Sequence, residues 1–441
     1  MRKRVSLSTT LALIILSIAL TISITMMLAM RHFNNQLQLV SQRQAMYTHV
    51  NEVDKVVREY YPNLDEELLR QGISKGYIDG LNDPYAVYYT PARYTAEQLR
   101  MSGKANNIGI TLTLDEQARP VVGRVQKASA AGKAGVAVGD VVTAVDGEPV
   151  EGKSLAELQA LIGSAEKVLI TVSRGEESHG FDLSAFEYTV RSVESATLGN
   201  VGYIRIFAFY KNTPSQFKSA VSALQEKGVT GIVFDLRNNA GGSPEAVNEV
   251  LSYIMPLGTY GTMTDVKGNV TKLNNTSGSQ VSLSIATLVN GGTAGEAEFF
   301  AGVLQDASLS IVVGQTTAGK AKYQEYFPLN SDQSALKLTT GEYGLVKSGS
   351  WQDVGIVPAV ETELPPEQAS ISMLLSAEED AQVQVALEQI SSSDMPEPEA
   401  TTTTTEETTK KTTEKATEAT KEESKDKTEE TTKAASEESE E

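Results

Sequence analysis

The segment TLVNGGTAGEAEFF, residues 287 to 300, contains a buried strand, a glycine turn and the start of a helix in one short stretch. The apolar strand ends at Val289, and Gly291 and Gly292 permit a tight turn. A strand that turns sharply into a helix is a layout that exposes a nucleophile in hydrolases. Gly295 stands where the hydroxyl of such a nucleophile is expected. The central question is therefore why this position has no side chain.

The pattern around this segment predicts an α/β fold. Long apolar strands alternate with amphipathic helices over residues 189 to 362, and such alternation indicates a layered α/β core. Residues 103 to 188 read instead as short strands and turns, including a hairpin turn at Asp146 and Gly147. Residues 34 to 75 show helical spacing, and residues 366 to 390 predict one further helix.

Composition excludes several classes of function. The net charge of −19 argues against nucleic acid as a partner. The chain has no cysteine, which excludes disulfides, thiolate zinc sites, iron–sulfur clusters and a cysteine nucleophile. Its three histidines stand in unsuitable contexts for a base or a metal cluster. We therefore expect no metal and no cofactor, and a hydrolase built from this chain would use Lys, Asp or Glu as its base.

The two ends of the chain have their own signatures. Residues 9–30 form an apolar run long enough to cross a bilayer as a helix, and the basic residues 2 to 4 keep the N-terminus cytoplasmic. A single-pass anchor in the cell membrane with the bulk of the chain extracytoplasmic is the prediction, and a cleaved signal peptide is the alternative. Residues 393–441 are rich in Thr, Glu and Lys and predict a disordered tail that acts as a spacer.

A nucleotide-binding loop is a competing interpretation of GQTTAGK, residues 314 to 320, which fits the G-x-x-x-x-G-K pattern. Ala321 follows the lysine and lacks the hydroxyl that binds magnesium. The next residues, AKYQEYFPL, predict a strand and not the helix whose N-terminus would hold a phosphate. Both observations weigh against this interpretation.

Taken together, these blocks resemble the carboxyl-terminal processing peptidases, tail-specific Ser/Lys proteases that carry a PDZ domain. The resemblance covers about residues 50 to 390. The segments that carry it are GLNDPYAVYYTP, NNIGITL, GDVVTAVDG, SLAELQALIG, VGYIRIFAFYKNT, GIVFDLRNNAGG, LVNGGTAGEAEFFAGVLQD, GQTTAGKAKYQEYFPL and DVGIVPAVE.

The resemblance implies an α/β peptidase core of the crotonase-like spiral type with an inserted PDZ domain and helical N- and C-terminal segments. The expected domains are a cytoplasmic N-terminus (1–8), a transmembrane anchor (9–30), a helical N-terminal segment (31–102), a PDZ domain (103–187), a peptidase-like core (188–362), a C-terminal helix (363–392) and a disordered tail (393–441).

The resemblance also implies the site residues. The family's general-base lysine falls on Lys320, and the glutamine that orients it falls on Gln324. The backbone amides that would bind the oxyanion belong to Gly241, Gly242 and Glu296. In the PDZ region, Ile108, Gly109 and Ile110 stand at the loop that holds a peptide carboxylate.

The nucleophile departs from the family pattern, because Gly295 stands where the serine belongs and Glu296 replaces a small residue. We expect Glu296 to form an ion pair with Lys320 that keeps the lysine protonated. Thr293 and Ser243 are the nearest candidates for a relocated hydroxyl. Thr293 should point elsewhere, since two residues of helix correspond to about 200° of rotation. Asp235 and Arg237 predict an ion pair that supports the fold.

These residues predict a peptidase relative that binds C-terminal tails of exported or membrane proteins and is proteolytically impaired. Assembly with itself or with peptidase relatives is a further possibility that the resemblance raises. One alternative is an active serine-type endopeptidase with a relocated hydroxyl and Lys320 as its base. Another is a PDZ adaptor that makes no use of the core cleft.

Overall fold

The computed structural model describes residues 7–392. The expected disordered tail and residues 1 to 6 of the expected cytoplasmic N-terminus lie outside the described residues. The helices of the described chain are α1 (Leu7–Tyr60), α2 (Glu66–Asp79), α3 (Pro91–Met101), α4 (Ala130–Ala134), α5 (Leu155–Ser164), α6 (Thr213–Glu226), α7 (Pro244–Ile254), α8 (Glu296–Asp306), α9 (Pro366–Ala369) and α10 (Ala381–Ser392).

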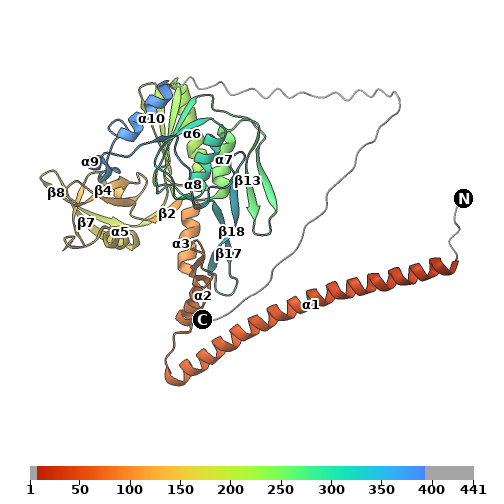
Figure 1. The fold of residues 1–441 in the computed structure, drawn as a ribbon. Coiled ribbons are helices and arrows are strands. Elements are labelled where there is room, and N and C mark those ends of the chain that lie inside the picture. The colour runs from red at the N-terminus through yellow and green to blue at the C-terminus, as the bar shows by residue number, and fades with distance from the viewer. Residues whose placement is uncertain (1–6, 393–441) are drawn as a thin grey trace, which may run out of the picture. The chain divides into compact units, whose positions relative to one another are not determined.

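A six-stranded sheet forms the centre of the core, in the order β10-β11-β12-β15-β16-β19. Its strands are β10 (Val193–Leu198), β11 (Val201–Ile206), β12 (Gly231–Asp235), β15 (Ser284–Val289), β16 (Ser310–Gly314) and β19 (Val360–Glu361). All neighbouring pairs except β10–β11 are parallel. Helices α6, α7 and α8 share an apolar cluster with one face, and α10 packs on the other (Figure 1). Because both faces are covered, the inner strands are mostly apolar.

A second, antiparallel sheet carries the lysine segment. It consists of β1 (Val87–Tyr89), β13 (Gly258–Asp265), β14 (Val270–Asn275), β17 (Lys322–Pro328) and β18 (Ala335–Leu345). Strand β1 comes from the N-terminal segment that the sequence predicts to be helical, and it pairs with β18. That segment is therefore not purely helical, because YAVYY offers an apolar edge that completes the sheet. Strand β17 confirms that a strand, not a helix, follows the G-x-x-x-x-G-K sequence.

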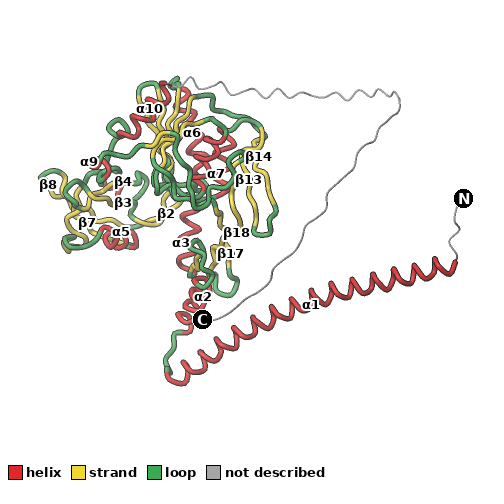
Figure 2. Tube along the Cα trace, viewed as in Figure 1, coloured by secondary structure: helices red, strands yellow, loops and turns green. Residues whose placement is uncertain are grey.

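A separate small β-domain precedes the core. Its sheet has the order β3-β4-β5-β7-β8, with β6 beside β5 (Figure 2). The strands are β3 (Ile110–Leu114), β4 (Pro120–Val125), β5 (Val141–Val145), β6 (Glu148–Pro149), β7 (Lys167–Arg174) and β8 (Glu177–Ser184), while β2 (Lys104–Asn107) and β9 (Phe186–Thr189) pair at its boundary. The domain has its own apolar cluster, to which helix α5 contributes Leu158 and Ile162. The domain thus has an independent core.

Helix α1 runs without a break from Leu7 to Tyr60. Within it, Leu13–Asn34 has a mean hydropathy of 2.4 and is long enough to cross a membrane. A signal sequence meets the same criterion, so both alternatives stay open. The helix continues beyond the apolar run because no glycine or proline interrupts the sequence until Pro62.

The expected ion pair of Asp235 and Arg237 forms at the end of β12, and it extends to the C-terminal segment. The Arg237 Nη2 atom lies 2.7 Å from Asp235 Oδ2 and 2.8 Å from Asp380 Oδ2. Asp380 also accepts hydrogen bonds from the amides of Gln382 and Val383 at the start of α10. The expected single C-terminal helix is wrong for this reason: the chain forms α9, turns, and begins α10 at this capping aspartate.

Replacing Arg237 by alanine is expected to lower the free energy of unfolding by about 3 kcal/mol, because Asp380 then stays buried without its cation and Asp235 keeps only Arg205, at 3.9 Å. Burial raises the pKa of Asp235, but Arg237 and Arg205 outweigh it and hold that pKa well below its usual range. Lys218→Ala is the control, since Lys218 forms a 2.7 Å pair with Glu249 at the surface, where such pairs contribute under about 1 kcal/mol. Equal denaturation midpoints for the two variants would contradict the prediction.

Candidate active site

The glycine turn after β15 is held by its own polar side chains. The Asn290 carboxamide oxygen accepts hydrogen bonds from the amides of Asn238 and Gly292. Thr293 is fully buried, and its hydroxyl accepts from the Asn290 amide and donates to the Leu236 carbonyl. Thr293 therefore points into the protein, as its position on the turn predicts.

Gly295 lies at the tip of the turn, at the N-terminus of α8, with φ 60° and ψ −121°. Residues that have a β-carbon rarely adopt these backbone angles. A β-carbon built on Gly295 would meet only the Ala240 carbonyl at 3.8 Å and Lys320 Cδ at 3.9 Å. The place of the missing hydroxymethyl group is thus open, and it adjoins the lysine.

Lys320 and Gln324 lie together, as the sequence predicts. The Lys320 ammonium donates to Gln324 Oε1 at 2.7 Å and lies 4.8 Å from the centre of the Tyr85 ring. Burial lowers the pKa of Lys320, although the carboxylate of Glu296 opposes the shift. A lysine that loses its proton more easily than usual is suited to act as a base.

Glu296 does not form the expected ion pair with Lys320; no such pair within 4.0 Å occurs in residues 7–392. The Glu296 carboxylate accepts instead from the Gly242 amide at 2.9 Å and from the Tyr343 hydroxyl at 3.3 Å. These two donors are fixed by the backbone and by packing, whereas the flexible lysine has Gln324 as its partner. The prediction of this ion pair is wrong because the Glu296 carboxylate accepts its hydrogen bonds from the Gly242 amide and the Tyr343 hydroxyl.

Two of the three expected oxyanion amides already have an acceptor. The Gly242 amide binds the Glu296 carboxylate, and the Gly241 amide donates to Asn239 Oδ1 at 2.9 Å. The Glu296 amide nitrogen lies close by, 3.0 Å from a β-carbon built on Gly241. A carboxylate oxygen of Glu296 therefore binds an amide that the sequence predicts to bind the substrate oxyanion.

Sequence reasoning missed Glu298, which connects the turn to the lysine segment. Its carboxylate is fully buried and accepts hydrogen bonds from the amides of Gly295 (2.9 Å), Gly319 (2.7 Å) and Lys320 (2.8 Å) and from the Thr317 hydroxyl. A glutamate three residues after the N-cap residue of a helix is typical of N-terminal capping, and that signal could have identified it.

Ser243, the other candidate for a relocated hydroxyl, caps helix α7. Its Oγ accepts from the Ala246 amide at 3.2 Å and donates to Glu245. In the described part of the chain, no hydrogen bond joins the hydroxyl of Ser243 or Thr293 to Lys320. Both hydroxyls have structural partners.

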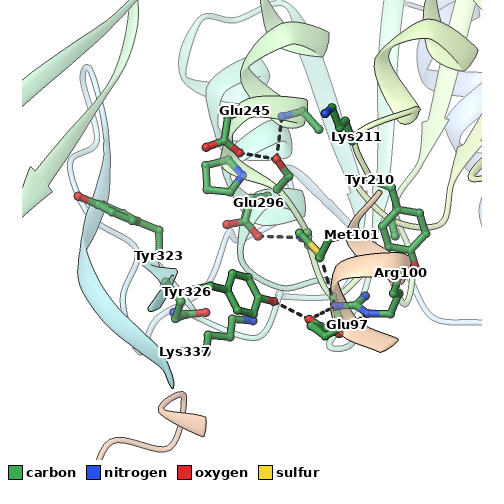
Figure 3. Close-up of a pocket in the computed structure, with 18 of the residues that line it drawn as sticks. Glu97, Arg100, Met101, Tyr210, Lys211, Glu245, Glu296, Tyr323, Tyr326 and Lys337 are labelled. Atoms are coloured by element: carbon green, nitrogen blue, oxygen red, sulfur yellow. Dashed lines mark hydrogen bonds and ion pairs between the residues drawn. The ribbon is translucent and has the colours of Figure 1, made fainter. Parts of the chain in front are cut away.

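A cavity of about 1170 Å³ lies at this site, and its lining includes Lys320, Gln324, Glu296, Gly241, Gly242 and Ser243. One wall is helix α3, where Glu97 binds Arg100 at 2.7 Å and accepts a hydrogen bond from the Tyr326 hydroxyl on β17 (Figure 3). Lys337 of β18 faces the same space, and burial lowers its pKa. Ile108, Gly109 and Ile110 are not among the residues that line this cavity. They lie in the small β-domain, where Ile108 and Ile110 are buried.

Comparison with known proteins assigns both parts of the chain. Residues 200–362 match Peptidase family S41, and residues 121–174 match the PDZ domain. The chain is 30% identical over 322 residues to the carboxy-terminal processing protease CtpA of Bacillus subtilis (strain 168), an alignment that covers 71% of this chain and 68% of that protein. This chain belongs to the C-terminal processing peptidases of family S41.

Three further proteins are similar to this chain in sequence or in structure. A probable CtpA-like serine protease of Staphylococcus aureus (strain COL) is 30% identical, over 73% of this chain and 66% of that protein. A putative S41 protease from Bacteroides fragilis NCTC 9343 has the same fold, with a TM-score of 0.56 at 15% identity over 72% of this chain and 90% of the other. A photosystem II D1 C-terminal processing protease aligns with a TM-score of 0.45 at 25% identity, over 73% and 89% of the two chains.

The comparisons confirm the family resemblance and the mixed α/β fold with a PDZ domain. The domain boundaries and the roles of the S41 site residues stay predictions. Within the site, the structure brings Lys320, Gln324, Gly295 and Gly242 together and shows that Glu296 contacts a different partner from the one expected.

The direction in which the Lys320 pKa is shifted can be predicted for this S41 site. We expect Lys320 to lose its proton at a lower pH than an ordinary lysine, and Glu296→Gln to lower its pKa further, because the favourable charge of Glu296 is removed while burial stays. NMR titration of labelled lysine side chains measures both shifts. Glu245→Gln, in the same cavity, should leave the Lys320 pKa unchanged. A higher Lys320 pKa in Glu296→Gln than in the unmodified chain would contradict this prediction.

Proposed function

We propose that this chain is a membrane-anchored C-terminal processing peptidase relative that binds C-terminal peptide tails outside the cytoplasm and cleaves them inefficiently. The observation that carries the proposal is Gly295, which leaves an open place beside Lys320 where the nucleophile belongs. Removing the nucleophile of a serine protease lowers turnover by about a millionfold. The chain retains the cleft, the base position and the PDZ domain, and the cleft and the PDZ domain are the parts that would bind a peptide.

The second feature in support is the occupied oxyanion position. A peptide carbonyl entering the cleft must compete with the Glu296 carboxylate for the Gly242 amide. Loss of one oxyanion donor alone costs about a hundredfold to a thousandfold in turnover. The relocated-hydroxyl alternative is weaker, since Thr293 and Ser243 serve the turn and the α7 cap.

The anchor belongs to the same proposal. The apolar window Leu13–Asn34 has the length of a membrane span, and the basic residues Arg2, Lys3 and Arg4 favour a cytoplasmic N-terminus. Tails of exported or membrane proteins would then be the partners within reach. Protease protection of the chain in intact cells and in spheroplasts tests this orientation.

The decisive experiment uses the full chain in detergent micelles with a quenched reporter peptide that has an apolar C-terminus. We expect no labelling by a fluorophosphonate, turnover equal to that of Lys320→Ala, and binding of the reporter measured by fluorescence anisotropy. Labelling together with turnover that depends on Lys320 would overturn the proposal. Ser243→Ala and Thr293→Val would then identify the hydroxyl that reacts.

A further inference from the structure

Strand β3 is one of the two edge strands of the PDZ sheet, and among the described strands it pairs with β4 alone. Helix α5 lies beside this edge. A peptide that adds to a PDZ sheet binds between such an edge strand and such a helix, and the backbone groups of the edge supply its hydrogen bonds. Whether these groups are available therefore decides whether a peptide can bind.

The edge groups of β3 are occupied by a side chain of α5. The carboxamide of Gln159 accepts a hydrogen bond from the Leu112 amide at 2.7 Å, and its nitrogen donates to the Ile110 carbonyl at 3.4 Å. Both backbone groups point away from β4, toward the helix. The amide of Gln159 thus makes the same pair of bonds, one accepted and one donated, that an added strand would make.

The carboxylate loop is occupied in the same way. The Gly109 amide donates to Asn107 Oδ1 at 2.9 Å, and the Tyr188 hydroxyl donates to the same oxygen at 2.8 Å. The loop is further fixed by the Ile108 carbonyl, which accepts from the Ala131 amide. An amide oxygen stands where the terminal carboxylate of a peptide would lie.

We infer that Gln159 is an internal competitor of the peptide, which must leave β3 before an extended C-terminal peptide with a free carboxylate can add to that edge. This inference rests on the peptide-binding part of the proposed function. Gln159 can leave because it is attached by its own flexible side chain, whereas β3 is held in the sheet. Asn107 competes with the terminal carboxylate of the peptide, and Gln159 competes with the peptide residues that precede this carboxylate.

The competition has a measurable size. Removing the Gln159 carboxamide frees the Leu112 amide and the Ile110 carbonyl, so the peptide no longer displaces an internal bond. One hydrogen bond contributes about 1 kcal/mol net, which corresponds to about fivefold in affinity. Gln159→Leu is therefore expected to bind the peptide about fivefold more tightly than the unmodified chain.

The test is fluorescence anisotropy on the full chain in detergent micelles, with a labelled decapeptide that ends in valine. Gln225→Leu is the matched control, because the Gln225 side chain also binds a distant backbone carbonyl, that of Gln280, but outside the PDZ domain. We expect tighter binding for Gln159→Leu, no change for Gln225→Leu, and loss of binding when the peptide ends in an amide. Equal or weaker binding by Gln159→Leu would overturn the inference.

Hydrogen exchange separates this inference from the proposed function. If no variant binds the peptide, the proposed peptide binding fails, and the role of Gln159 is judged on the free protein. Exchange of residues 108 to 114, followed by mass spectrometry, should be faster in Gln159→Leu than in the unmodified chain and in Gln225→Leu. Unchanged exchange there would show that Gln159 does not hold the edge of β3.

Discussion

The double variant Gly295→Ser, Glu296→Ala is expected to cleave a reporter with an apolar C-terminus at least a hundredfold faster than Gly295→Ser alone. The serine would occupy the open place beside Lys320, where a β-carbon meets nothing closer than 3.8 Å. Removing the Glu296 carboxylate releases the Gly242 amide for the oxyanion. The hundredfold difference is the lower end of the contribution of one oxyanion donor.

Gly295→Ser alone meets two obstacles. The backbone at position 295 must keep φ at 60°, which costs a residue other than glycine about 1 to 3 kcal/mol. In addition, the Gly242 amide, which is the predicted oxyanion donor, stays bound to the Glu296 carboxylate. We expect fluorophosphonate labelling of this single variant to be slow. Adding Lys320→Ala to the double variant should abolish turnover, because the serine then has no base. Cleavage by the triple variant at the rate of the double would show that Lys320 is not the base.

Replacing Glu298 by alanine is expected to lower the free energy of unfolding by about 5 kcal/mol. The carboxylate accepts four hydrogen bonds in a fully buried position, and its loss leaves three backbone amides and the Thr317 hydroxyl without their acceptor. Each unsatisfied buried donor costs about 1 to 3 kcal/mol. Because these donors come from the turn and from the lysine segment, the variant should also separate Gly295 from Lys320.

Urea denaturation followed by circular dichroism measures this effect. Glu245→Ala is the control, since Glu245 also lies in the first turn of a helix but is exposed at least in part and accepts from the Ser243 hydroxyl. A loss of about 0.5 kcal/mol or less is expected there. If Glu298→Ala unfolds at the same urea concentration as Glu245→Ala, the four hydrogen bonds do not support the site.

Local sequence patterns were sufficient for much of the site. The glycine turn, the strand after Lys320 and the four-residue spacing to Gln324 depend on neighbouring residues, and each appears in the structure as expected. The buried pair of Asp235 and Arg237 was predicted as well. Its extension to Asp380 was not, because the two segments are 143 residues apart and no local pattern connects them.

Glu296 and Gln159 show where local reasoning fails. A carboxylate predicted to lie beside the lysine in the site was expected to pair with it, but Glu296 had three possible donors and contacts the Gly242 amide and Tyr343. Gln159 was one polar residue of an amphipathic helix, and nothing local distinguishes it from its neighbours. In both cases the partner is a group from another element, and its orientation depends on how the elements pack.

The sequence by itself determined, through its resemblance to the C-terminal processing peptidases, that the chain has an S41-like core with a PDZ domain, and it predicts Lys320 at the base position and Gly295 at the nucleophile position. The resemblance is carried by short sequence motifs, which the chain has before it folds. Only the tertiary structure decided that Glu296 occupies the Gly242 amide, that Glu298 joins the turn to Lys320, and that Gln159 covers β3. Those contacts depend on packing, because a flexible polar side chain binds whichever donor or acceptor the fold places within its reach.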